Sequence, residues 1–126
     1  MRSILVGALL SASMWASPAH AGILAAGTIY GGPTQVTAVC YLFNAGTTGV
    51  VITSIAIYDE VGNAYPVVSN NCSGSLAMHR SCRTVAHIFD GIPYACRAVA
   101  SITSNLRGNL ELRDASGYVL NSQQLR

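Results

Sequence analysis

The side chains best suited to chemistry are two histidines, an aspartate and several serines in the second half of the chain. His79, His87 and Asp90 could join a serine in a Ser-His-Asp hydrolase site, in which the histidine acts as a general base. The motifs that usually position such groups, Gly-x-Ser-x-Gly and His-Glu-x-x-His, are absent from the sequence. We therefore predict no catalytic residue, no metal site and no cofactor site, and we keep a small extracellular hydrolase or inhibitor as an alternative.

The four cysteines are the other reactive set. Their spacings are longer than those of the usual zinc motifs, and an even number in an exported chain indicates disulfides. Four cysteines allow three pairings. Cys72 and Cys82 would close a short loop rich in glycine and serine, while Cys40 and Cys96 each lie in the middle of a strand-like run with small neighbours. The sequence thus predicts the disulfides Cys40–Cys96 and Cys72–Cys82.

The first 21 residues have the features of a secretory signal peptide. Arg2 supplies a positive charge, residues 4–10 are apolar, and residues 17–21 end in an Ala-x-Ala cleavage pattern. Cleavage after Ala21 would leave residues 22–126, a length typical of one domain. We therefore expect an exported protein, either periplasmic or secreted.

Charge and hydropathy restrict the classes of partner. Seven arginines oppose five acidic residues, lysine is absent, and the formal net charge is +2 at pH 7. A charge so near zero argues against nucleic acid and against a polybasic membrane contact. No run after the signal is long and apolar enough for a transmembrane helix. The expected partner is a protein or another component of the cell envelope, and the oligomeric state is left open.

Short alternating runs separated by turn residues follow the signal. About seven or eight antiparallel strands and no helix are expected, which is typical of an immunoglobulin-like β-sandwich. In the second strand, Val51, Thr53, Ile55 and Ile57 are expected to share one face. Residues 69–75 are expected to form a loop. The expected strands cover residues 34–44, 50–58, 64–68, 82–89, 94–103, 109–113 and 118–125, with an edge strand near 23–30.

Aromatic residues provide the candidate contact surface. If Cys40 faces the core, strand alternation turns Val39, Tyr41 and Phe43 outward, which makes an unusually apolar outer face. Such a face is either covered by another segment of the chain or used for contact with a partner. The candidate interaction residues are Tyr30, Tyr41, Phe43, Tyr94 and Tyr118.

The two halves of the mature chain resemble each other. Cys40 is followed by Asp59 and Gly62, and Cys96 is followed at similar spacing by Asp114 and a glycine three residues further on. Each half is predicted to contain strands joined by a hairpin at the Asp-x-x-Gly sequence. The sequence thus suggests two similar units facing each other, although β-hairpins can also resemble one another through composition alone.

Two segments resemble a known family. Residues 44–55, Asn-Ala-Gly-Thr-Thr-Gly-Val-Val-Ile-Thr-Ser-Ile, are similar to the N-x-G-T-x-x-V-x-I-x-x-I run of bacterial immunoglobulin-like domains of the abnormal-spindle/Hydin type, also called choice-of-anchor D. Cys72 to Cys82, with Leu76 between them and Val85 after, resembles the C…L…C…V segment of that family. The resemblance covers roughly residues 36–89. The chain also resembles small single-domain exported proteins of proteobacteria without an assigned role.

The chain departs from the family pattern in three ways. Met78-His79-Arg80 stands where the family usually has Pro-Gly before the second cysteine, the following Phe-x-Pro is missing, and Cys40 and Cys96 are additional. What the resemblance implies is a seven-stranded sandwich used for adhesion, scaffolding or envelope interaction, with no catalytic residues. We therefore expect a non-catalytic exported interaction or structural module. A pilin-like subunit that exchanges a strand is a second alternative, and it predicts an incomplete sandwich with an open groove.

Overall fold

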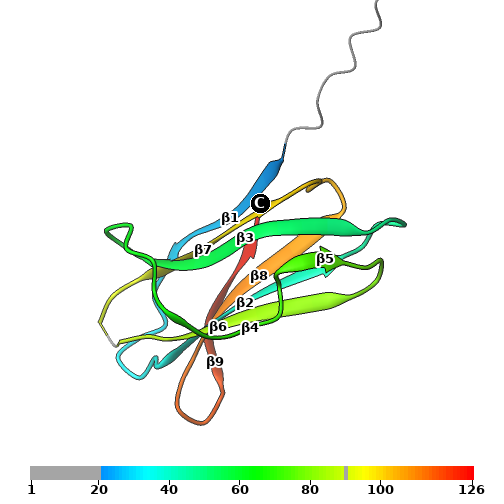
Figure 1. The fold of residues 1–126 in the computed structure, drawn as a ribbon. Coiled ribbons are helices and arrows are strands. Elements are labelled where there is room, and N and C mark those ends of the chain that lie inside the picture. The colour runs from blue at the N-terminus through cyan, green and yellow to red at the C-terminus, as the bar shows by residue number, and fades with distance from the viewer. Residues whose placement is uncertain (1–20, 90) are drawn as a thin grey trace, which may run out of the picture.

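The computed structural model describes residues 21–89 and 91–126 as two stacked antiparallel sheets (Figure 1). One sheet has four strands in the order β1-β7-β3-β5, and the other has five in the order β4-β6-β2-β8-β9. The predicted signal peptide lies outside the described residues except for Ala21, as does Asp90. The strands are β1 (Gly22–Ile29), β2 (Thr37–Asn44), β3 (Val50–Asp59), β4 (Val67–Asn70), β5 (Gly74–Leu76), β6 (Ser81–His87), β7 (Tyr94–Ala100), β8 (Leu106–Arg113) and β9 (Val119–Leu125).

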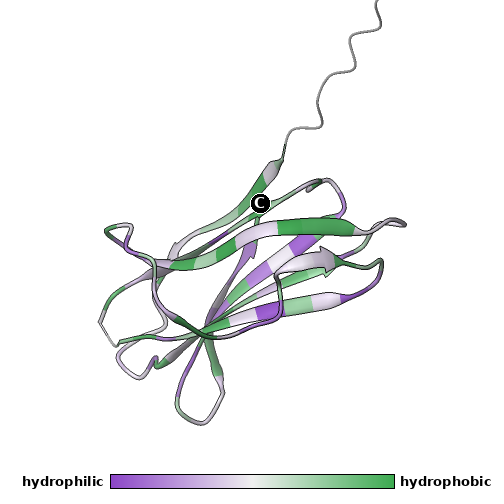
Figure 2. Ribbon diagram, viewed as in Figure 1, coloured by the Kyte–Doolittle hydropathy of each residue, from purple (hydrophilic) through white to green (hydrophobic). Residues whose placement is uncertain are grey.

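The β-sandwich predicted from the alternating pattern is confirmed. Buried positions alternate with more exposed ones along β6, as expected for a strand with one face in the core. The coloured ribbon shows apolar and polar segments following one another along the strands (Figure 2). No helix long and apolar enough to cross a membrane is found within residues 21–89 and 91–126.

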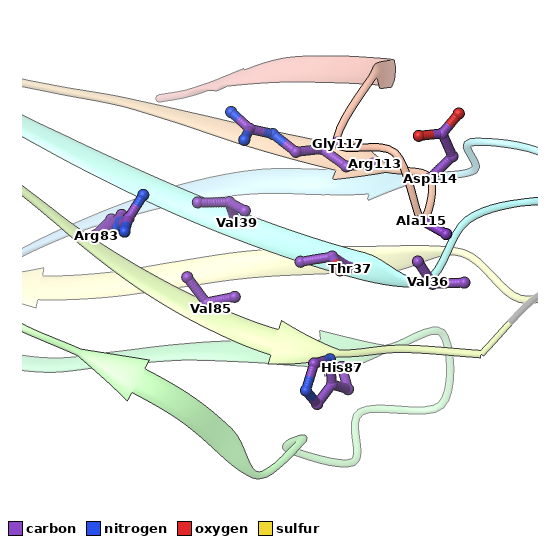
Figure 3. Close-up of a pocket in the computed structure, with 10 residues that line it drawn as sticks. All are labelled: Val36, Thr37, Val39, Arg83, Val85, His87, Arg113, Asp114, Ala115 and Gly117. Carbon is purple, nitrogen blue, oxygen red and sulfur yellow. The ribbon is translucent and has the colours of Figure 1, made fainter.

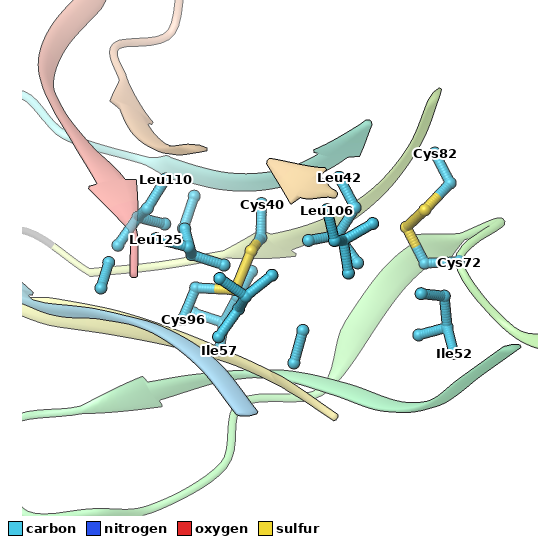
Figure 4. Packing of buried hydrophobic residues seen from close by; sticks show 14 of the residues in the cluster. Cys40, Leu42, Ile52, Ile57, Cys72, Cys82, Cys96, Leu106, Leu110 and Leu125 are labelled. Carbon is cyan, nitrogen blue, oxygen red and sulfur yellow. A yellow bond between two sulfur atoms is a disulfide. The ribbon is translucent and has the colours of Figure 1, made fainter. Parts of the chain in front are cut away.

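Both predicted disulfides are present. Cys40–Cys96 joins β2, the central strand of the five-stranded sheet, to β7 of the other sheet. It lies in the middle of the core, between leucine side chains of the five-stranded sheet and Ile57 of the four-stranded sheet (Figure 4). Cys72–Cys82 ties the crossover between β4 and β5 to β6 near one end of the core. The small neighbours Ala38 and Ala98, both fully buried, let the two sheets approach around the central bridge.

The pairing of strands follows the pseudo-repeat. Exchanging β1, β2 and β3 with β6, β7 and β8 maps the four pairings among these six strands onto one another, because β1–β7 becomes β6–β2 and β3–β7 becomes β8–β2. The central disulfide joins the two equivalent strands β2 and β7. The chain is thus organised as two interlocked units with the same strand order.

The two Asp-x-x-Gly hairpins share one hydrogen-bond pattern. The Asp59 carboxylate accepts bonds from the backbone amides of Val61 and Asn63, and the Asp114 carboxylate accepts bonds from the amides two and four residues later. Gly62 and Gly117 follow with φ values of 88° and 85°, where a side chain would be strained. The aspartate and the glycine therefore serve the backbone of each turn.

The single face predicted for Val51, Thr53, Ile55 and Ile57 in strand β3 is wrong for the first two of these residues. Val50 and Ile52 are buried, whereas Val51 and Thr53 are exposed. The register with β7 shifts between Ile52 and Ser54, so an extra residue reverses the alternation before Ile57 enters the core. A regular strand was the wrong assumption, because a bulge leaves no strong signal in the sequence.

The predicted loop at residues 69–75 and the predicted strand at 64–68 also need correction. Ala64 makes only an isolated bridge with Tyr58, and the chain then crosses to the other sheet. There β4 pairs with β6 at the sheet edge, and β5 returns to pair with the start of β3. These two strands raise the number to nine. Both are short, which limits the unpaired edge that they expose.

A further contact closes the sandwich beside β1. Ala25 exchanges two backbone hydrogen bonds with Arg126, with N···O distances of 3.0 and 2.9 Å. Because β1 also pairs with β7, this strand bridges one sheet to the end of β9 in the other. The edge strand expected near residues 23–30 is therefore fully integrated into the fold.

Candidate functional site

The two histidines lie far apart on the described chain. His79 precedes β6 in a turn, and His87 is the last residue of that strand, so β6 separates them. Among the hydrogen bonds within residues 21–89 and 91–126, none joins either imidazole to a serine. No group of three His, Cys, Asp or Glu side chains that could hold a metal ion occurs in this part of the chain. Asp90, the acid of the candidate hydrolase set, lies outside the described residues.

His79 has an unusual backbone conformation. Its φ of 57° lies in the left-handed region, and it is the one non-glycine residue with positive φ in the described chain. The turn is held by the bond from the Arg80 amide to the Ala77 carbonyl and by the bond from the His79 amide to the Asn44 carbonyl. Its side chain is exposed. The conformation therefore serves the turn that leads into Cys82.

Replacing His79 with glycine is expected to raise the free energy of unfolding by about 0.5–1 kcal/mol, since glycine adopts this conformation without a side-chain clash. Equilibrium urea unfolding followed by far-UV circular dichroism would measure the change. A matched His87→Gly substitution in β6 should instead destabilise the protein, because glycine weakens a strand. A loss of stability in the first variant would contradict this account of the turn.

The prediction that Tyr94 contacts a partner is wrong, because its side chain is fully buried. Its hydroxyl accepts a hydrogen bond from the Phe89 amide at 2.9 Å, and Tyr65 packs against its ring edge to face. Burial and the neighbouring Tyr65 hydroxyl raise the pKa of Tyr94 to about 12. The signal was available in the sequence, because Tyr94 stands two residues before Cys96 and the strand alternation places both on the same face.

The four other predicted contact residues do not form one patch. Tyr41 and Phe43 project from the outer face of β2, where the first is half-buried and the second exposed. Tyr118 is exposed in the turn between β8 and β9. Tyr30 follows β1, and its carbonyl accepts a bond from the Asn121 side chain of β9. Only Tyr41 and Phe43 therefore belong to a shared sheet face.

That shared face is the solvent side of the five-stranded sheet, which we call the outer face. The strand register places Arg83 beside Tyr41, Val85 beside Val39 and His87 beside Thr37. On the other side of β2, Asn109, Glu111 and Arg113 occupy the matching positions of β8. The outer face thus comprises Thr37, Val39, Tyr41, Phe43, Arg83, Val85, His87, Asn109, Glu111 and Arg113.

Val39 points outward, as expected, yet it is only 3% exposed. The Arg113 guanidinium donates to the Tyr41 hydroxyl at 2.9 Å and lies 5.9 Å from the centre of its ring. This contact spans the position of Val39, because Arg113 is paired with Thr37 and Val39 lies between Thr37 and Tyr41 on β2. Glu111 binds the same guanidinium, and its hydrogen bonds raise the pKa of Arg113 above the usual value. The outer face is therefore held in a fixed arrangement over an apolar floor.

Two hollows open on the outer face and share Arg83. The larger, about 450 Å³, is floored by valines of β2 and β6 and extends to the turn after β8 (Figure 3). The smaller, about 400 Å³, is lined by Tyr41 and Ser81 among others. The Arg83 side chain makes no hydrogen bond or ion pair with any other described residue, whereas Glu111 is engaged by Arg113. The junction of the hollows thus carries a free positive charge beside apolar surface.

No pattern in the sequence marks Arg83 as a contact residue, and Val85 belongs only to the family resemblance. The alternation Arg83, Val85, His87 already placed these side chains together on the face opposite Cys82. What was missing was the neighbour of β6, because only the pairing with β2 brings Arg83 beside Tyr41. That pairing joins segments about forty residues apart in the chain and has no local signal.

Comparison with known proteins adds no relative. No protein-family model, no curated protein and no solved structure matches the chain. The resemblance to immunoglobulin-like domains of the choice-of-anchor D type stays a prediction.

Proposed function

We propose that the protein is a non-catalytic exported module that binds a protein or another envelope component through its outer face. The observation that carries the proposal is the pair Tyr41 and Phe43 on the outer face of the central strand. Arg113 holds Tyr41 in place, and Arg83, which is unpaired within the described residues, lies beside it. A surface fixed before binding loses little conformational entropy on association. Aromatic and arginine side chains are also the ones that contribute most to protein interfaces.

The two disulfides support the exported setting of this function. Disulfides persist in oxidising compartments such as the periplasm and the extracellular space. All four cysteines of the described chain are paired, and the central bridge lies deep in the core. The periplasm and the medium outside the cell both satisfy this requirement.

The two alternatives receive less support. A strand-exchanging subunit requires an open groove in the sandwich, but β1 already fills the position beside β7 and Ala25 binds Arg126. A hydrolase requires a histidine close to a serine or an acid in a cleft, and within the described residues the histidines make no such contact. We therefore propose the binding module ahead of these two alternatives.

Site-specific photo-crosslinking in cells that export the protein would test this proposal. A photoreactive phenylalanine analogue in place of Phe43, which is 41% exposed on the outer face, should give a covalent adduct of higher mass. The same analogue in place of Ile102, which is 48% exposed after β7, should give none. The two positions are similar in exposure, but Phe43 lies on the outer face of β2 and Ile102 lies in the segment between β7 and β8. Absence of an adduct at Phe43, or equal adducts at both positions, would contradict the proposal.

A further inference from the structure

The hairpin between β3 and the Tyr65 segment presents an acid and an apolar side chain side by side. Glu60 is exposed and makes no ion pair or side-chain hydrogen bond with the other described residues. Val61 is 76% exposed, the largest value among the exposed large apolar side chains of the described chain. An exposed valine beside an unpaired carboxylate suits a partner surface that offers apolar contact and a cation.

Hydrogen bonds to one carboxylate define the shape of this hairpin. Asp59 accepts hydrogen bonds from the amides of Val61 and Asn63, and the Asn63 side chain also donates to its carboxylate. Desolvation raises the pKa of Asp59, but the hydrogen bonds from Asn63, Val61 and Gly62 outweigh it and hold this pKa below its usual value. Asp59 is thus committed to the turn, and Glu60 is the acid left free at its tip.

The outer face offers the complementary chemistry. Arg83 is unpaired within the described chain, and Val39 and Val85 form the floor of the adjoining hollow (Figure 3). Arg83 and Val85 are two residues apart on the same side of β6, so their side chains stand about 7 Å apart. Glu60 and Val61 are neighbours at the tip of a turn. The longer side chain of Glu60 would extend to Arg83 while the shorter side chain of Val61 lies over the valine floor.

We propose that the occupant of the outer face is the hairpin of a second copy of this chain, with Glu60 paired to Arg83 and Val61 resting on the valine floor. The contact must be between molecules, because the hairpin extends the four-stranded sheet whereas Arg83 lies on the far side of the five-stranded sheet. This inference rests on the proposed function, since it identifies the partner of the same face. Either a reciprocal pair or a head-to-tail chain would satisfy it.

A charge exchange tests the contact. Sedimentation velocity of the oxidised mature protein should show association that weakens when salt rises from about 50 to about 500 mM. E60R and R83E should each weaken association by about tenfold or more, since each places like charges together. The double variant E60R/R83E should restore it, and so should a mixture of the two single variants. R97E changes an exposed arginine on β7 and should leave association unchanged.

Three results would overturn the inference: a monomer at concentrations up to about 1 mM, no recovery in the double variant, or an equal loss in R97E. Far-UV circular dichroism of every variant would show whether the fold is retained, and the mixture keeps the test valid if the double variant fails to fold. If the protein is monomeric and its Phe43 position crosslinks to a different component, this inference is wrong and the proposed function stands. Absence of any Phe43 adduct from a protein that self-associates would remove the proposed function of the face as well.

Discussion

Replacing Cys40 and Cys96 together by alanine is expected to lower the free energy of unfolding by about 4 kcal/mol, because this bridge closes a long loop. Its cysteines are 56 residues apart in sequence, and the bridge restricts the unfolded chain more than a short loop does. Both sulfur atoms are also buried between the sheets, so the substitution removes packing as well. A small domain has a total stability of about 5–15 kcal/mol, so the variant is expected to be only marginally folded.

The second bridge supplies the matched control. Cys72 and Cys82 are only 10 residues apart, and their replacement by alanine is expected to cost about 3 kcal/mol in the same chain-entropy treatment. Urea unfolding followed by far-UV circular dichroism suits both variants, since the sole tryptophan precedes the predicted cleavage site. An equal or larger loss for the short-loop variant would show that the crossover between β4 and β5, rather than the two central strands, dominates stability.

The cysteine pairing could be predicted because the relevant signals are local. Cys72 and Cys82 flank a segment flexible enough to bend back, and Cys40 and Cys96 sit among small core-facing residues in alternating runs. The fold class followed from the same alternation. The pseudo-repeat was visible for a related reason, since an aspartate and a glycine are required at fixed positions in each hairpin.

Other features depend on contacts between distant segments. The bulge in β3 is set by its pairing with β7, and the short strands β4 and β5 form only because the chain crosses between sheets. Arg83 became a candidate only through its position beside β2, and Val39 proved buried because Arg113 reaches across it. Such effects arise from tertiary packing, which outweighs local preference in strands.

Gln35 illustrates a buried polar residue whose role could not be predicted from its type. It is fully buried, although glutamine usually lies at the surface. Its side-chain amide donates to the carbonyls of Phe89 and Ile92, and its side-chain oxygen accepts from the Gly31 amide. This one side chain therefore joins the segment before β2 to the segment between β6 and β7, which leads to the buried Tyr94.

Gln35→Glu is expected to lower the free energy of unfolding by about 3 kcal/mol or more at neutral pH. The introduced carboxylate would be buried, would lose both donors and would face two carbonyl oxygens. Its pKa in the folded protein would lie above the ordinary value of about 4.3, so the folded state would bind the proton more tightly than the unfolded state. The penalty is therefore smallest below about pH 4 and grows as the pH rises.

Two further variants separate charge from the loss of hydrogen bonds. Gln35→Ala removes the same bonds without adding a charge, so its loss of stability should not vary between about pH 4 and pH 7. Gln123→Glu adds a carboxylate at an exposed position of β9 and should change stability by less than about 0.5 kcal/mol. Urea unfolding at both pH values would measure all three variants. A loss of stability in Gln35→Glu that does not vary with pH would contradict this account. It would mean that water reaches the introduced carboxylate because the segment before β2 has separated from the segment between β6 and β7.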